Sequence, residues 1–525
     1  MSALATTGRP LSPVDLKESA RAPRARRWLV AAAWVAGSIA LTGGYLRISL
    51  ASRVGSDGAN NVLQAWDLLH GHLMLRGWQI GDANYYFLEL PLLALGEAFF
   101  GLGNFAAHVA SALTYMLVTV VALAAAGTGS RGPAKAVRFA VVLVVLAAPL
   151  FSGLTPLALE EPDHIGTTVF IIGAFLLIDQ WPTRRLTPPL VLAILVAGQF
   201  EDLITRYVAV PAIVLVCAYR AIAARRLRSA DALLTAVAVV SVPLSSLAIA
   251  VWAHFGGFAT AVTRGTLDNP DQWPHNAATT WASLRQMFGA QSMPGATPRP
   301  WQADFGMLCL VAALLGVAWV AWRWNRASRA EQLLCAAILV NVAVFFLSSF
   351  AWTPKPHEIA AVLPCGAILA ARALVPPRID RGPLAAAALA ATALIAAVPL
   401  AYAATRPVFT SQQAPLVAWL EAHRLTHGLA TYQDGASSTV LSSNRIQLRV
   451  VHVGATSLGD SHYEVNSAWY VKSQNYANFI VANPGQKLPP ALVEHHFGKP
   501  TAIYQVQGWT ILVYRKNLFR LLTPS

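Results

Sequence analysis

Eleven apolar runs, most of them long enough to cross a lipid bilayer, constrain the fold of this chain more than any other feature of its sequence. A membrane-spanning helix needs about 20 consecutive, mainly apolar residues. The runs lie at 28–50, 104–126, 139–153, 165–181, 187–200, 206–222, 231–255, 305–322, 332–351, 358–375 and 383–404. Two of them, 139–153 and 187–200, are short. We therefore predict an all-α polytopic membrane protein.

The composition agrees with a membrane location and argues against a nucleic-acid partner. Of the 525 residues, 55% are hydrophobic and 12% are charged, whereas a soluble domain has about 25% charged residues. The formal net charge is +14, but the basic residues form short clusters between apolar runs. No basic arm with interleaved aromatic residues is present. The placement of the basic residues therefore indicates how the chain is oriented in a membrane.

The basic clusters predict the topology, because Lys and Arg collect in cytoplasmic connections. The clusters lie at Arg21–Arg27, Arg131–Arg138, Arg184–Arg185, Arg220–Arg228, Arg323–Arg329 and Arg372–Arg381. They occupy every second connection, as expected for a multi-pass plasma-membrane protein with a cytoplasmic N-terminus. The outer face then carries 51–103, 154–164, 201–205, 256–304, 352–357 and everything after about 405.

The same division predicts three parts of the chain. Residues 1–27 form a cytoplasmic tail, 28–404 a transmembrane domain, and 405–525 an extracytoplasmic α/β domain. Within 51–103, residues 59–73 have the spacing of an amphipathic helix, and 85–100 form a second apolar segment. Both are expected to lie in the membrane interface.

After about residue 412 the pattern is that of a small α/β domain. Helices are predicted at 412–425 and 488–498, and strands at 428–434, 445–453, 477–483, 501–507 and 509–515.

Two outer acids are the candidate catalytic residues. Asp57 follows the first span, and Asp163 lies in LALEEPDHIGTT with His164 beside it. Asp57 has the position of a general base that deprotonates a hydroxyl at the membrane surface. The alternative is that each acid simply caps the helix that follows it. Acids at membrane depth are costly unless they are paired, hydrated or used, and this favours a function for Asp163 and His164.

Further candidates for substrate binding lie in other outer loops. Glu89 has apolar neighbours, which should raise its pKa unless a cation is near; it is expected to pair with Arg or Lys, or to bind a divalent metal with a histidine such as His164, His275 or His357. Asp202 and Arg206, four residues apart, predict either an ion pair within a helix or a cavity wall with Arg206 facing a phosphate.

The segment WTPKPHEIAAVLP places Lys355 and His357 at the outer end of a span, between stiffening prolines. Lys355 is a candidate for binding a carrier phosphate, or else an ordinary lysine that reaches the lipid headgroups. No cofactor is certain from the sequence, although a divalent metal is possible. No GxSxG, HExxH, P-loop or GxGxxG motif followed by a suitable acid occurs.

On these residues the chain resembles the GT-C fold glycosyltransferases, membrane enzymes that take sugars from polyprenyl-phosphate carriers. The resemblance rests on the acid after the first span, the two interfacial segments, the acid of the second outer loop, the eleven spans and the outer C-terminal domain. More narrowly, SDGANNVLQAWDLLHGHLMLRGW, EPDHIGTT and the C-terminal stretches WLEAHRLTHGLATYQD, WY and ANFIVAN resemble actinobacterial multispan proteins. Asp57 then matches the family's catalytic acid and Asp163 its second acid.

The resemblance implies an inverting sugar transfer from a polyprenyl-phosphate donor to an extracytoplasmic acceptor in the envelope, with membrane lipids as the other partner. Two alternatives stay open: a catalytically inactive GT-C-like scaffold in envelope assembly, and a lipid or solute transporter. A transporter is disfavoured because the acids lie at the outer surface and no internal repeat is visible.

Overall fold

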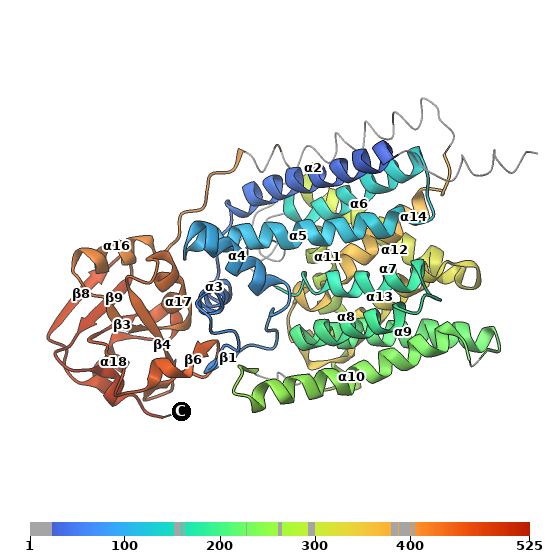
Figure 1. Ribbon diagram of the computed structural model, residues 1–525. Coiled ribbons are helices and arrows are strands. Elements are labelled where there is room, and N and C mark those ends of the chain that lie inside the picture. Colours follow the sequence, from blue (N-terminus) through green and yellow to red (C-terminus); the bar gives the residue numbers. More distant parts are fainter. Residues whose placement is uncertain are drawn as a thin grey trace, which may run out of the picture.

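The computed structural model describes residues 24–151, 159–160, 163–226, 228–260, 265–291, 300–379, 387, 401 and 405–524. Apolar helices form a bundle, and an α/β region sits at one end of it (Figure 1). Ten apolar helices of the described residues match predicted spans. They are α2 (Arg24–Ser49), α5 (Asn104–Gly127), α6 (Pro133–Phe151), α7 (Thr168–Gln180), α8 (Thr187–Glu201), α9 (Leu203–Ala223), α10 (Ala230–His254), α12 (Pro300–Trp322), α13 (Arg329–Leu347) and α14 (Val362–Leu374).

Seven of these described helices are long and apolar enough to cross a membrane, whereas α7, α8 and α14 are shorter. The polytopic membrane prediction is therefore confirmed. The prediction that the run at 139–153 is short is wrong, because α6 already begins at Pro133 and passes through the basic residues that seemed to end it. The predicted span 383–404 falls almost entirely outside the described residues.

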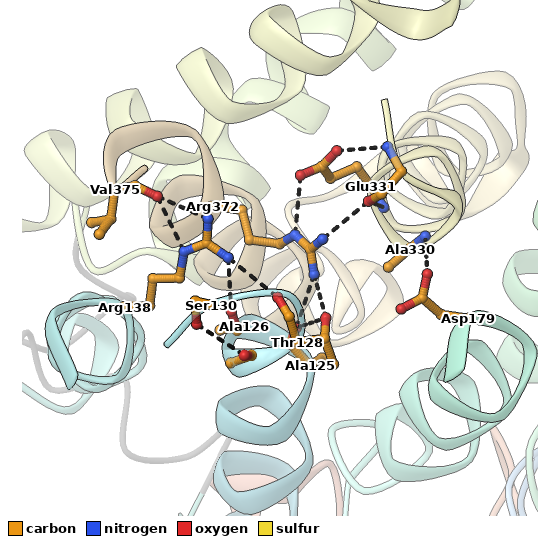
Figure 2. Close-up of polar contacts among 12 residues, drawn as sticks. Ala125, Ala126, Thr128, Ser130, Arg138, Asp179, Ala330, Glu331, Arg372 and Val375 are labelled. Carbon is orange, nitrogen blue, oxygen red and sulfur yellow. Dashed lines mark hydrogen bonds and ion pairs between the residues drawn. The ribbon is translucent and has the colours of Figure 1, made fainter. Parts of the chain in front are cut away.

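Two arginines, Arg138 and Arg372, join helix ends on the side of the bundle away from the α/β region (Figure 1), and Figure 2 shows their contacts. Arg138 of α6 donates to the carbonyl oxygen of Val375, at 2.9 and 3.1 Å, just beyond α14. Arg372 of α14 donates to Glu331 at 3.1 Å and to the Thr128 hydroxyl at 2.6 Å. Carbonyls at a helix C-terminus lack partners within the helix, so the guanidinium groups supply the missing donors.

The α/β region contains a six-stranded sheet in the order β5-β4-β3-β7-β9-β8. Its strands are β3 (His427–Ala430), β4 (Gln447–Val453), β5 (Leu458–Asp460), β7 (Phe479–Ala482), β8 (Ala502–Val506) and β9 (Trp509–Val513). Helices α16 (Ala414–Ala422), α17 (Tyr432–Leu441) and α18 (Pro490–Phe497) accompany it. Strands β4, β3 and β7 are parallel, while β5, β9 and β8 pair antiparallel. The predicted α/β character is confirmed, although 428–434 is a strand only to Ala430, and α17 begins at Tyr432.

The first loop between spans connects the bundle to this region. It contains α3 (Ser56–Leu69), β1 (Trp78–Ile80) and α4 (Glu89–Phe100). Strand β1 pairs with β2 (Ala259–Thr260) on one side and with β6 (Val465–Asn466) on the other. Three segments far apart in the sequence thus share one small sheet, and in Figure 1 α3 lies between the bundle and the α/β region.

The expected helix in 59–73 is present as α3, but its surroundings differ from the prediction. Its polar residues Asn60, Asn61 and Gln64 are buried, whereas Leu69 is 42% exposed and Leu73, beyond the helix, is 62% exposed. The physical reason is that both α4 and α17 pack on α3, so protein surrounds much of the helix. The amphipathic helix is therefore present, with part of its polar face buried in protein, and its place at the membrane interface stays a prediction.

Candidate active site

Asp57 lies in the first turn of α3, where Gly55 is the N-cap. The alternative that Asp57 caps the helix is wrong, because no side chain caps α3. Its carboxylate instead accepts a hydrogen bond from the hydroxyl of Tyr432, the first residue of α17. Asp57 is exposed, and the N-terminal end of a helix favours a negative charge there. The candidate base is thus held by a side chain from the α/β region.

A second carboxyl group, that of Glu464, contacts the same Tyr432 hydroxyl. Glu464 is buried and has a left-handed backbone conformation, with φ of 49°. A Cβ atom at Gly81 would lie 2.9 Å from its Oε1, so the absence of a side chain at Gly81 leaves room for the carboxyl group. Neither Tyr432 nor Glu464 was predicted as a site residue, because only the fold brings these two side chains to Asp57.

The protonation of this trio follows from its geometry. Tyr432 has one hydroxyl proton and cannot donate to both carboxyl groups. Burial and the charge of Asp57 raise the pKa of Glu464 to about 8. Glu464 is therefore protonated at neutral pH, which leaves the hydroxyl proton of Tyr432 for Asp57. Desolvation and the charges of Asp163 and Asp82 raise the pKa of Asp57, and the hydrogen bond from Tyr432 opposes them.

His164 and Asp202 form a buried ion pair, with Nδ1 and Oδ2 2.8 Å apart. Burial acts against both charges, but the mutual attraction prevails: the pKa of His164 is raised and that of Asp202 is lowered. Thr167 donates to the same carboxylate at 2.5 Å. The His164 ring stacks on His357, with ring centroids 5.8 Å apart. Asp163 accepts from the backbone N–H of His164 at 2.8 Å, so four of the predicted residues gather here.

Glu89 is almost fully buried, at 1% exposure, on α4. Burial and the neighbouring Glu201 raise its pKa well above the ordinary value. A Cβ atom at Gly166 would lie 1.6 Å from Oε1 of Glu89, so the Glu89 carboxyl group fills the space that glycine leaves open. The expected pairing with Arg or Lys is wrong, because among the described residues Glu89 has no ion pair. Two buried carboxyl groups this close cannot both be charged, so the protonated form of Glu89 is favoured.

Arg206 does not pair with Asp202, so the predicted ion pair within a helix is wrong. Its guanidinium group donates to the hydroxyls of Ser245 and Ser246 at 3.0 and 3.1 Å, and to Gln199 at 3.4 Å. It lines a cavity of about 390 Å³ between α9 and α10. Of the two interpretations of this segment, the cavity wall is the one that the geometry supports.

Three cavities meet around this segment. A groove of about 740 Å³, lined mainly by apolar side chains of α8, α10 and the first loop, shares Phe200 with the Arg206 cavity. The Arg206 cavity shares Asp82, Leu203 and Tyr207 with a third cavity of about 230 Å³, which His164 and Asp202 also line. Asp82 therefore lies where the Arg206 cavity and the third cavity adjoin, and its charge raises the pKa of Asp57.

Lys355 lies beside the third cavity rather than in it. Its Nζ is 5.5 Å from the ring centroids of Phe350 and Trp352, and Phe350 lines the cavity. Glu358 lines it too, with its carboxyl group 4.0 Å from His357. Within the described part of the chain, no group of three or more His, Cys, Asp or Glu residues is placed to hold a metal ion. Among the described residues, Glu89 therefore does not belong to a set of side chains that could hold the suggested divalent metal.

Comparisons with known proteins address the fold. No protein-family model matches the chain, and no curated protein sequence matches it. Among solved structures, ArnT from Cupriavidus metallidurans in the apo state superposes with a TM-score of 0.55 and 14% identity, covering 96% of this chain and 100% of ArnT. The same protein bound to undecaprenyl phosphate gives 0.52 and 15%, covering 95% of this chain and 99% of ArnT. The chain has the fold of ArnT. The GT-C architecture expected from the sequence is therefore confirmed over nearly the whole length.

Proposed function

We propose that this chain is a membrane glycosyltransferase that moves a sugar from a polyprenyl-phosphate carrier to an acceptor hydroxyl on the extracytoplasmic side, with inversion. The observation that carries the proposal is the setting of Asp57: an exposed carboxylate, held by Tyr432, just beyond the first span. The ArnT fold supports it, since ArnT has been captured with undecaprenyl phosphate bound.

The proposed reaction assigns Asp57 the role of general base. The acceptor hydroxyl gives its proton to Asp57 while its oxygen attacks the anomeric carbon of the donor sugar. The bond between that carbon and the carrier phosphate oxygen breaks, and its electron pair leaves with the phosphate. Attack from the face opposite the leaving group inverts the configuration. The chain supplies position, a base, and positive charge where the phosphate leaves.

The connected cavities offer a route for the donor. The apolar groove between α8 and α10 suits a polyprenyl tail, since its lining is largely aliphatic and aromatic. The adjoining cavity contains Arg206, whose forked guanidinium suits a phosphate group. Lys355, with His357 and His164, is the second candidate for a phosphate or sugar contact. Asp163, near enough to affect the pKa of Asp57, completes the acidic side of the site.

Transfer itself is the test of this function. Membranes containing the wild-type chain would receive radiolabelled polyprenyl-phosphate pentoses and hexoses, and label would be followed into other lipids, glycans and proteins. We expect a product whose anomeric configuration is opposite to that of the donor. If the wild-type chain binds a donor yet passes label to nothing, the glycosyltransferase proposal fails, and a scaffold or transporter replaces it.

Arg206→Ala examines the donor site in the same assay. Losing charge-assisted hydrogen bonds of this kind costs about 1.5–3 kcal/mol, so donor KM should rise about tenfold or more. Arg184→Ala is the matched control, because Arg184 is exposed and only stacks on Trp181, with its guanidinium carbon 5.2 Å from the ring centroid. An unchanged donor KM in Arg206→Ala would remove Arg206 from the donor site.

A further inference from the structure

Another cavity lies between Asp57 and the α/β region. It has a volume of about 390 Å³ and is lined by the start of α3, including Asp57, and by residues that follow β3 and β7. Unlike the groove between α8 and α10, its wall is mainly polar. Asp57 therefore faces a polar space that the donor route does not use.

The topology of the sheet explains why a cavity forms at this place. Strand β3 has β4, the next long strand along the chain, on one side, and β7, which comes later, on the other. The connections after β3 and β7 leave the same sheet edge in different directions, because these strands are parallel. Open α/β sheets bind ligands in the crevice at the carboxyl ends of strands where the order reverses. Here Asp57, from the start of α3, forms part of the wall of that crevice.

The lining is built around a buried acid. Asp434, with 0% exposure, accepts hydrogen bonds from Asn483 at 3.2 Å and from the indole N–H of Trp509 at 3.1 Å. These bonds fix the direction of the amide and the indole ring. Gln413 also reaches Asp434, at 3.4 Å. A buried carboxylate thus orients side chains that line the cavity.

The polar groups of the lining are mostly neutral. Five side chains carry primary amides, and each amide both donates and accepts hydrogen bonds. Those of Gln412 and Gln433 are exposed and have no hydrogen-bond partner among the described residues. The charged lining consists of Asp57, Asp434 and Arg53, and Arg53 already pairs with Glu160 at 2.6 Å. No surplus positive charge is available for a phosphate or another polyanion.

A ligand with many hydroxyl groups and no net charge matches this lining. Each hydroxyl donates and accepts, as the amides do, and the flat face of Trp509 offers apolar contact to the carbon face of a sugar ring. We propose that this cavity is the acceptor subsite, and that it binds the neutral, hydroxyl-rich end of a glycan with one hydroxyl directed to Asp57. The proposal rests on the glycosyltransferase function and names its acceptor class.

Binding without turnover tests this inference separately from the reaction. The purified full-length protein, in detergent, would be applied to an array of neutral hexose and pentose oligosaccharides, phosphorylated sugars and acidic peptides. We expect retention by neutral oligosaccharides, and a loss of at least about tenfold in apparent affinity in Gln433→Ala, Gln486→Ala and Trp509→Ala. Gln474→Ala, an exposed glutamine of the same region outside the cavity, is the matched control.

The outcomes separate the two proposals. Retention only by phosphorylated sugars or acidic peptides, or by nothing, overturns the subsite. So does glycan retention that survives both Gln433→Ala and Gln486→Ala, whose side chains are not part of a hydrophobic core and whose loss should leave folding intact. Glycan binding that these variants abolish, in a protein that consumes no donor, instead supports the subsite while the transfer reaction fails.

Discussion

At the scale of single residues, the contact between Tyr432 and Asp57 sets the condition under which the candidate base works. Its hydrogen bond favours the ionised carboxylate, against desolvation and the charges of Asp163 and Asp82. A general base acts only when deprotonated. The phenol therefore extends the activity of Asp57 toward lower pH.

Tyr432→Phe should consequently raise the pKa of Asp57. The acidic limb of the pH profile of kcat/KM for sugar transfer would move to higher pH, with a smaller change on the plateau. Tyr476→Phe, at an exposed tyrosine of the same region, serves as the control. An acidic limb that stays in place in Tyr432→Phe would show that Tyr432 does not act on the catalytic base.

Glu464 makes a prediction about stability. Its pKa is raised from about 4.5 in water to about 8 in the folded chain, so folding favours the protonated form. The stabilisation that Glu464 adds to the folded chain is complete below pH 4.5 and is lost as the pH rises toward 8. Glu464→Gln imitates the protonated acid and should melt at a higher temperature than wild type at pH 8, with the difference shrinking near pH 5. A melting temperature that falls equally at both values would refute the protonated assignment.

At the scale of elements, the membrane makes the helices predictable. A span must be apolar over a length fixed by the bilayer, and that is a local property of sequence. The surroundings of α3 were not predictable in this way, because α17, which packs on it, lies hundreds of residues away in the sequence. Asp57 was found from its place after the first span, whereas its partner Tyr432 is 375 residues distant and sits where a strand was expected.

The arginine contacts at the remote helix ends give a prediction for the bundle. Arg372, with a side chain 7% exposed, connects the ends of α5 and α14 to the start of α13 through Glu331. The Glu331 side chain is 24% exposed, so the pair is only partly buried, and leaving the hydrogen-bonding groups without Arg372 should cost about 1–3 kcal/mol. Arg372→Ala should lower the melting temperature in detergent by several degrees, whereas the exposed Arg184→Ala should not. Equal melting temperatures would mean that these contacts are not needed to hold the helix ends.

At the scale of the whole molecule, the site exists only while the α/β region is docked on the bundle. Trp469 of that region packs on Trp78 of β1, with ring centroids 5.1 Å apart. The guanidinium carbon of Arg449 lies 4.1 Å from the centroid of the Trp469 ring. Trp469→Ala should speed hydrogen exchange in β1 and β6, which pair across the junction, and leave β7 protected. Uniformly faster exchange would instead indicate that the α/β region itself is destabilised.

The central claim, that Asp57 is the base of a glycosyl transfer, is tested most directly by single-turnover kinetics. Wild-type and Asp57→Asn proteins would be loaded with a polyprenyl-phosphate sugar and mixed with acceptor, with Asp271→Asn, an exposed aspartate, as control. We expect unchanged donor binding and a transfer rate about 10²–10⁴-fold lower in Asp57→Asn. A transfer rate in Asp57→Asn within about threefold of wild type would contradict this role, because the loss would be far smaller than a general base contributes.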